Sequence, residues 1–70
     1  MKVVDRELEV FGAESYVMYT FSSGHQLRQW YNGTTIAYTM KGNYATQAMM
    51  HRLARIASEY EDTRIQTNEK

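Results

Sequence analysis

Residues 26 to 41, QLRQWYNGTTIAYTMK, carry the pattern that decides the fold. On both sides of Asn32-Gly33 the side chains alternate with a period of two, as they do in half-buried β-strands. Asn-Gly between two such runs favours a two-residue type I′ hairpin, because that turn needs a positive φ at both central residues. The segment therefore predicts two antiparallel strands, about Gln26 to Asn32 and about Thr34 to Lys41.

Two earlier segments, about Lys2 to Phe11 and about Tyr16 to Ser22, alternate with the same period. Only short connections, at residues 12–15 and 22–25, separate these runs from each other and from the hairpin. Short connections join strands that lie side by side, so we expect one antiparallel sheet in sequential order. In this sheet Phe21 should lie opposite Leu27.

After Asn43 the apolar period changes to 3.6, which indicates a helix that ends near Glu61. Asn43 is a suitable N-cap residue for this helix. Its apolar stripe contains Ala45, Met49, Leu53, Ile56 and Tyr60. The predicted fold is α+β, a four-stranded antiparallel meander with one C-terminal helix packed on one face (ββββα). Residues 1–62 should form a single domain, and residues 63–70 a polar tail or a short edge strand.

The two faces of the predicted sheet differ, because one helix can cover only one of them. The type I′ turn places Trp30 opposite Thr35 and Gln29 opposite Ile36. The face predicted to lie under the helix carries Leu8, Val17, Phe21, Leu27, Gln29, Tyr31, Ile36 and Tyr38. The face predicted to stay open carries Tyr16, Met18, Arg28, Trp30 and Thr35.

This open face is the first candidate binding site, with the five residues just given as its partner-binding side chains. Trp, Tyr and Arg dominate the hot spots of protein interfaces, and Met is enriched there. Glu7 and Glu9 point to the same face, where they would repel a phosphate backbone, so a protein partner is favoured over nucleic acid. The alternatives are that Trp30 only shields the backbone of the sheet, or that the two faces are assigned the wrong way round.

The outer face of the predicted helix is the second candidate. Tyr44, Ala48, His51 and Arg55 recur there at helical spacing, with Arg52 beside them. Such a ridge could bind phosphate or an acidic helix, which makes a small nucleic-acid-binding regulator the alternative function. The competing interpretation is a solvated face on which Arg55 pairs with Glu59 four residues later.

Charge is segregated along the chain although the formal net charge is zero. All eight acids lie before residue 15 or after residue 58, and the intervening block carries four bases and most of the aromatic residues. Four positive charges indicate nucleic-acid binding only weakly. A chain of 70 residues buries a small core, and without cysteine it has no disulfide to add stability. A homodimer is therefore expected.

The sequence contains no convincing catalytic constellation. His25 follows Ser22 and Ser23, but no acid lies nearby to orient it as a base. His25 and His51 have no carboxylate spaced to complete a metal shell. We therefore predict no catalysis, no cofactor and no metal.

The acidic first two dozen residues do not look like a secretory signal, and no apolar run reaches membrane-spanning length, so a cytoplasmic protein is expected. In size, in lacking cysteine and in lacking catalytic chemistry, the chain resembles the small proteins with which phages and plasmids disable host machinery. This resemblance rests on general character. It implies a non-catalytic inhibitor or regulator of a host enzyme or defence complex.

Overall fold

The computed structural model describes the backbone of residues 1–68 and the side chains of residues 1–64. Four strands form one antiparallel sheet in the order β1-β2-β3-β4, followed by a helix. The elements are β1 (Val3–Glu9), a 3₁₀ turn (Gly12–Glu14), β2 (Tyr16–Phe21), β3 (Gln26–Trp30), β4 (Thr35–Tyr38) and α1 (Gln47–Asn68). The predicted ββββα fold is confirmed.

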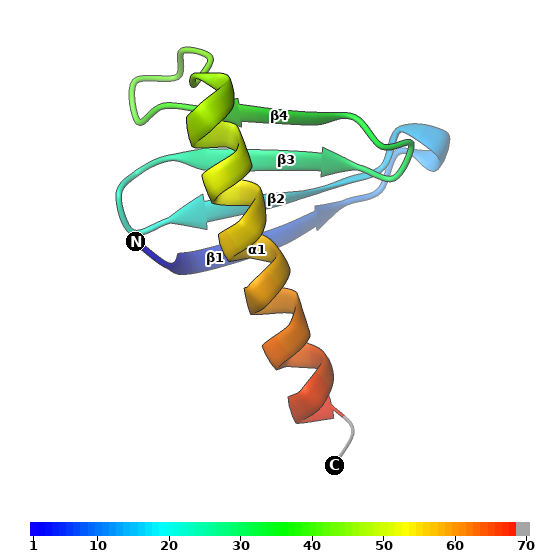
Figure 1. Ribbon diagram of the computed structural model, residues 1–70. Helices are drawn as coiled ribbons and strands as arrows, with labels where there is room; N and C mark the ends of the chain where they lie inside the picture. Colours follow the sequence, from blue (N-terminus) through cyan, green and yellow to red (C-terminus); the bar gives the residue numbers. More distant parts are fainter. Residues whose placement is uncertain (69–70) are drawn as a thin grey trace.

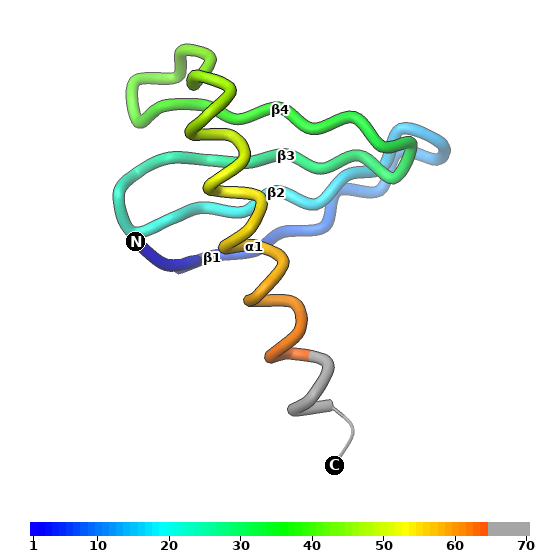
Figure 2. The backbone as a smooth tube through the Cα atoms, in the orientation of Figure 1, coloured from blue at the N-terminus to red at the C-terminus, as the bar shows by residue number. Residues whose placement is uncertain are grey.

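Helix α1 crosses one face of the sheet obliquely, from β4 at its first turns to β1, and leaves the sheet past β1 (Figure 1). The tube in Figure 2 shows the same path, with the strands in one layer and the helix in a second. The opposite face of the sheet has no element of the described chain upon it. The expectation of one covered face and one open face is therefore correct.

The core lies between α1 and the two central strands. Side chains of β2 alternate between buried and half-buried, as a strand with one covered face requires. The buried apolar residues are Val17, Tyr19, Phe21, Leu27, Ala37, Leu53 and Ala57. From the predicted stripe, Leu53 is fully buried, and Ala45, Met49, Ile56 and Tyr60 pack against this core.

Three successive turns have the same construction. In each, three residues link the last pair of the hairpin, and the third residue is a glycine with positive φ, at 95°, 100° and 87° for Gly24, Gly33 and Gly42. The backbone N–H groups that close the pairs are those of Phe21, Trp30 and Thr39, which donate to the carbonyls of His25, Thr34 and Asn43. Because L side chains disfavour this φ, each glycine has a conformational role. The three glycines stand nine residues apart.

The predicted register between β3 and β4 is wrong by one residue. No non-glycine residue of the described chain has a positive φ, so Asn32 cannot take its place in a type I′ turn. The chain uses the three-residue loop instead, in which glycine alone takes the positive φ. Leu27 consequently pairs with Ala37, and Gln29 pairs with Thr35.

A slip of one residue moves every side chain of a strand to the other face. Ala37 is therefore buried under the helix, whereas Ile36 and Tyr38, predicted to lie there, face the open side. Thr35, predicted on the open face, lies on the helix side. Between β2 and β3 the shift is two residues, with Leu27 opposite Tyr19 instead of Phe21, so the predicted faces are kept.

Two other core predictions fail at the edges of the covered face. Leu8 does share the helix side with Val17, its cross-strand partner, but it is 49% exposed because α1 does not extend over it. Tyr31, also expected in the core, belongs to the β3–β4 loop and is 68% exposed.

The boundaries of the helix also differ from the prediction. Helix α1 begins at Gln47 rather than after Asn43, and Thr46 caps it by accepting a hydrogen bond from the N–H of Met49 (3.2 Å). Residues 43–45 instead run along the free edge of β4, with Tyr44 opposite Tyr38. The helix continues to Asn68 instead of ending near Glu61, so residues 63–68 are helical, and residues 69 and 70 of the predicted tail lie outside the described residues.

Candidate functional site

The open face of the sheet carries four of the five predicted partner-binding residues. Tyr16 and Met18 project from β2, and Trp30 and Arg28 lie opposite them on β3. The prediction that these four share the uncovered face is confirmed. Ile36 occupies the position expected for Thr35.

An aromatic cluster extends across this face, and its members touch in sequence. The Trp30 and Tyr16 rings lie 5.0 Å apart between centroids, and Phe11 stacks on Tyr16 at 6.2 Å. Tyr38 and Tyr44 form a second pair at 5.6 Å. Phe11 and Tyr44 remain 61% and 75% exposed. The cluster thus presents aromatic surface to solvent at both ends.

Arg28 links the two aromatic pairs. Its guanidinium carbon lies 5.3 Å from the centroid of the Tyr16 ring and 5.2 Å from that of Tyr38. Each contact is a cation–π interaction, worth about 0.5–2 kcal/mol depending on exposure. The two rings therefore hold the guanidinium in place before any partner arrives, and this lowers the entropic cost of binding through it.

Arg28 also lacks a counter-ion among the residues whose side chains the structure describes. Three arginines of residues 1–64 are partly buried, and the other two, Arg6 and Arg64, both contact Glu61. Arg28 has no carboxylate within ion-pair distance there, and its buried Nε has no hydrogen-bond partner in the described chain. Leaving a buried donor unpaired costs about 1–3 kcal/mol, so such a group needs an explanation beyond folding.

The acids predicted to share the open face are found on it. Glu7 pairs with Met18 and Glu9 pairs with Tyr16, so both point to the uncovered side, as does Asp5 beside Thr20. None of these three carboxylates forms an ion pair with another residue that the structure describes. The face is therefore acidic along β1 and carries its positive charge, Arg28, on β3.

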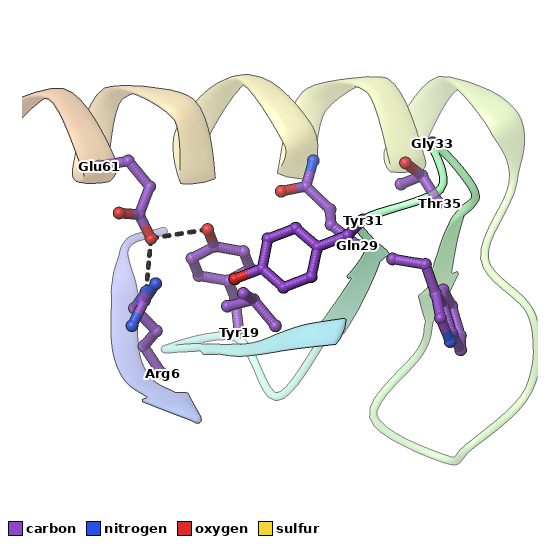
Figure 3. A pocket seen from close by; sticks show the side chains of 9 residues that line it. Arg6, Tyr19, Gln29, Tyr31, Gly33, Thr35 and Glu61 are labelled. Carbon is purple, nitrogen blue, oxygen red and sulfur yellow. Dashed lines mark hydrogen bonds and ion pairs between the residues drawn. The ribbon is translucent and has the colours of Figure 1, made fainter. Parts of the chain in front are cut away.

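A second polar cluster, which the sequence analysis missed, lies on the helix side. The Glu61 carboxylate of α1 accepts hydrogen bonds from Arg6 of β1 and from the Tyr19 hydroxyl (2.7 Å), as Figure 3 shows. It also accepts a hydrogen bond from Arg64 (2.9 Å). Beside it opens a groove of about 450 Å³, lined further by Gln29 and Tyr31. The available signal was Arg6, which alternation places on the same face as Leu8.

The proton equilibria of this cluster are coupled. Burial alone would raise the pKa of Glu61, but the hydrogen bonds from Tyr19, Arg6 and Arg64 outweigh it and lower that pKa below its ordinary value of 4.5. Burial and the hydrogen bond to Glu61 raise the pKa of Tyr19 to about 12. The cluster is therefore an ionised carboxylate held by neutral tyrosine and two cations, which fastens α1 to β1 and β2.

Substituting Glu61→Gln tests this fastening. We expect a loss of about 2 kcal/mol in the free energy of unfolding at neutral pH, because the partly buried Arg6 loses its counter-ion. A carboxyl group whose pKa is lower in the folded state than in the unfolded state stabilises the protein at pH values above the unfolded pKa. This stabilisation is lost as the pH falls through the folded pKa. The difference between wild type and variant should therefore be full at neutral pH and shrink as pH falls below about 4.5.

Urea unfolding followed by circular dichroism across this pH range measures the difference. Glu59→Gln is the matched control, because the Glu59 carboxylate contacts only the exposed Arg55 at 3.7 Å and should change stability by no more than about 0.5 kcal/mol. Equal effects of the two substitutions would show that the Glu61 cluster does not hold the helix.

The helix ridge predicted as the second site is incomplete. Ala48, His51, Arg52 and Arg55 are exposed on α1, but Tyr44 lies on the open sheet face instead. The expected pair between Arg55 and Glu59 is present. The ridge therefore has less positive charge and less aromatic surface than the sequence suggested.

The Ser23–His25 turn has no third member that would orient the histidine among residues 1–64. The Ser23 hydroxyl lies 2.7 Å from Nδ1 of His25, but no carboxylate contacts this ring, and Ser23 Oγ also lies 3.1 Å from the sulfur of Met1. No group of three or more metal-ligating side chains occurs in the described part of the chain. Within the same part, no helix is long and apolar enough to cross a membrane.

Comparison with protein-family models, curated proteins and solved structures finds no match to this chain.

Proposed function

We propose that this chain is a small, non-catalytic protein-binding module whose docking surface is the open face of the sheet. Arg28 carries the proposal: it is held between two tyrosine rings, partly buried, and has no carboxylate partner among the described residues. Tyr, Trp and Arg side chains of this kind supply most of the energy of protein interfaces. Docking on this face would regulate or inhibit a partner that is another protein, as expected from the resemblance to small phage and plasmid proteins, and would form a dimer where the partner is a second copy of the chain.

Electrostatics favour a protein partner over nucleic acid. A nucleic-acid surface must neutralise several phosphates, and its affinity grows with the number of positive charges it supplies. The open face sets Asp5, Glu7 and Glu9 against the one charge of Arg28. On the helix ridge Arg55 is paired with Glu59, which leaves Arg52 as the main free charge. Neither surface resembles a phosphate-binding track.

Trp30→Ala tests the proposed surface. Truncating a hot-spot tryptophan of an interface typically costs about 2 kcal/mol or more, or about 30-fold in affinity. We expect the affinity-tagged variant to lose the partner that the tagged wild type retains, whether that partner is another protein or an untagged copy of the chain. Quantitative capture from the native host, followed by titration of the captured partner, gives the measurement.

Tyr31→Ala is the matched control, because this aromatic side chain follows Trp30 directly but is an exposed loop residue outside the aromatic cluster. Circular dichroism confirms that both variants are folded. If Trp30→Ala binds every partner as tightly as Tyr31→Ala does, the open face is not the docking surface.

A further inference from the structure

The open face repeats one chemical pattern in three rows that run across the strands. In each row β1 supplies a carboxylate, β2 an uncharged side chain and β3 a hydrogen-bond donor. The rows are Asp5–Thr20–Gln26, Glu7–Met18–Arg28 and Glu9–Tyr16–Trp30. Acids and donors are thus arranged symmetrically on either side of β2, each one strand spacing, about 4.8 Å, away from it.

From this symmetry we propose that the partner of the open face is a second copy of this chain. The proposal rests on the proposed function, because it names the occupant of the same face. The two sheets stack face to face, related by a two-fold axis that runs along β2 between them. That rotation places β1 of each copy over β3 of the other, so every carboxylate meets a donor.

The middle row supplies the strongest contacts. Glu7 of one copy meets Arg28 of the other, and the symmetry repeats the pair on the far side of Met18. This gives the guanidinium of Arg28 a carboxylate, which no residue of its own chain among residues 1–64 provides. Charge-assisted pairs of this kind are the stronger hydrogen bonds of proteins. In the outer rows the Trp30 indole N–H of one copy donates to Glu9 of the other copy, and the Gln26 amide of one copy donates to Asp5 of the other.

A residue on a two-fold axis contacts the same residue of the other copy, so a charged side chain there would face a like charge. The three side chains of β2 on this face are Thr20, Met18 and Tyr16, and none of them is charged. Met18 packs against Met18 of the partner subunit at the centre. The column that lies on the axis therefore satisfies the condition that symmetry imposes.

Edge-to-edge pairing of two copies through β1 lacks this match. If β1 added to β1 of a second copy edge to edge, the carboxylates of Asp5, Glu7 and Glu9 would stand opposite carboxylates, which destabilises a sheet. Acidic side chains on an edge strand are a common device against such pairing. Face-to-face sheets pack about 10 Å apart, so Glu7 of one copy must extend toward the Arg28 guanidinium that two tyrosine rings hold on the other copy.

Charge reversal provides the test. Glu7→Arg and Arg28→Glu each turn both copies of the central pair into like charges, so each variant alone should dissociate at least about tenfold more readily than wild type. An equimolar mixture of the two variants restores opposite charges at both positions. Analytical ultracentrifugation of wild type, each variant and the mixture should therefore give dimer, monomer, monomer and heterodimer.

Asp62→Arg is the matched control, since it makes the same charge change on an exposed helix position away from the open face. It should leave the dimer intact. Glu7 is exposed, so Glu7→Arg stays folded and informative even if Arg28→Glu disturbs the sheet.

Two results overturn the inference: wild type that is monomeric at all concentrations, or single variants that dimerise as tightly as Asp62→Arg. If either occurs while Trp30→Ala still abolishes capture of another protein, the open face binds a different protein and the proposed function stands. If Trp30→Ala also has no effect on any capture, both proposals fail.

Discussion

Leu53→Ala should leave much of the protein unfolded at room temperature. Leu53 is fully buried in the first third of α1, where it packs against the core residues of the sheet. Removing a buried leucine side chain costs about 2–5 kcal/mol, through lost burial and the cavity left behind. A domain of this size has a total stability of only about 5 kcal/mol. One substitution therefore removes most of the margin.

Urea unfolding measured by circular dichroism quantifies the loss. Leu8→Ala is the matched control: the same side chain is truncated on the same side of the sheet, where it is half-exposed and lies beyond the helix. We expect it to cost less than about 1 kcal/mol, in line with the smaller apolar area that it buries. Similar losses for the two leucines would contradict the position of α1 on the sheet.

Gly24→Ala should destabilise the protein by about 3 kcal/mol, which is more than the same change at Gly33. Both glycines have a strongly positive φ, 95° and 100°, so an alanine at either position strains the backbone by about 1–2 kcal/mol. At Gly24 the new Cβ would also lie 2.9 Å from the Cβ of Met40, too close for two carbon atoms. Relieving this overlap requires the neighbouring turn to move, at a further cost of about 1–2 kcal/mol.

Gly33→Ala supplies the control, because nothing lies within 4 Å of its added Cβ. The difference in unfolding free energy between the two variants isolates the contact with Met40. Thermal and urea unfolding of both variants should agree on its sign. No difference between them would mean that the turns at Gly24 and Met40 do not touch.

The sequence predicts the correct face for a strand's side chains when the assumed and the observed turns both contain an odd number of residues, or both an even number. Between β2 and β3 the assumed and observed loops both contain an odd number of residues, so Leu27 and Phe21 stay on the core side despite a shift in register. Between β3 and β4 the loop is three residues instead of two, and the assignment of Ile36 reverses. Asn32-Gly33 suits both loops, so this pair alone does not distinguish them.

A distinguishing signal was present in the spacing of the glycines. Gly24, Gly33 and Gly42 occupy the same place in three equal turns, and only a three-residue loop gives all three the same role. The Ser-Ser-Gly and Met-Lys-Gly turns contain no Asn-Gly pair, so comparing them with Tyr-Asn-Gly favours the longer loop.

The part of the candidate site that follows from the alternation of side chains along one strand was predictable from the sequence. Trp30 and Arg28 follow from the period of two along β3. The contribution of Tyr38 was hidden by the reversed register, and that of Tyr44 by the late start of the helix. The Arg6–Glu61 pair joins residues 55 positions apart, and no local pattern in a single sequence reports such a contact.

Because the turns are equally spaced, the number of strands can change without changing the faces of the side chains. The position of Glu61 in the helix, however, suits a sheet of four strands. Because each strand and turn together use nine residues, the chain returns to the same row and face two strands later, as Met18 and Ile36 show. Duplicating residues 25–42 would thus add a hairpin without turning any side chain over. The helix would move outward with its attachment point, however, and Glu61 would no longer reach Arg6 on the first strand. The strand register would therefore accept an added hairpin, but the helix would lose this contact with the first strand.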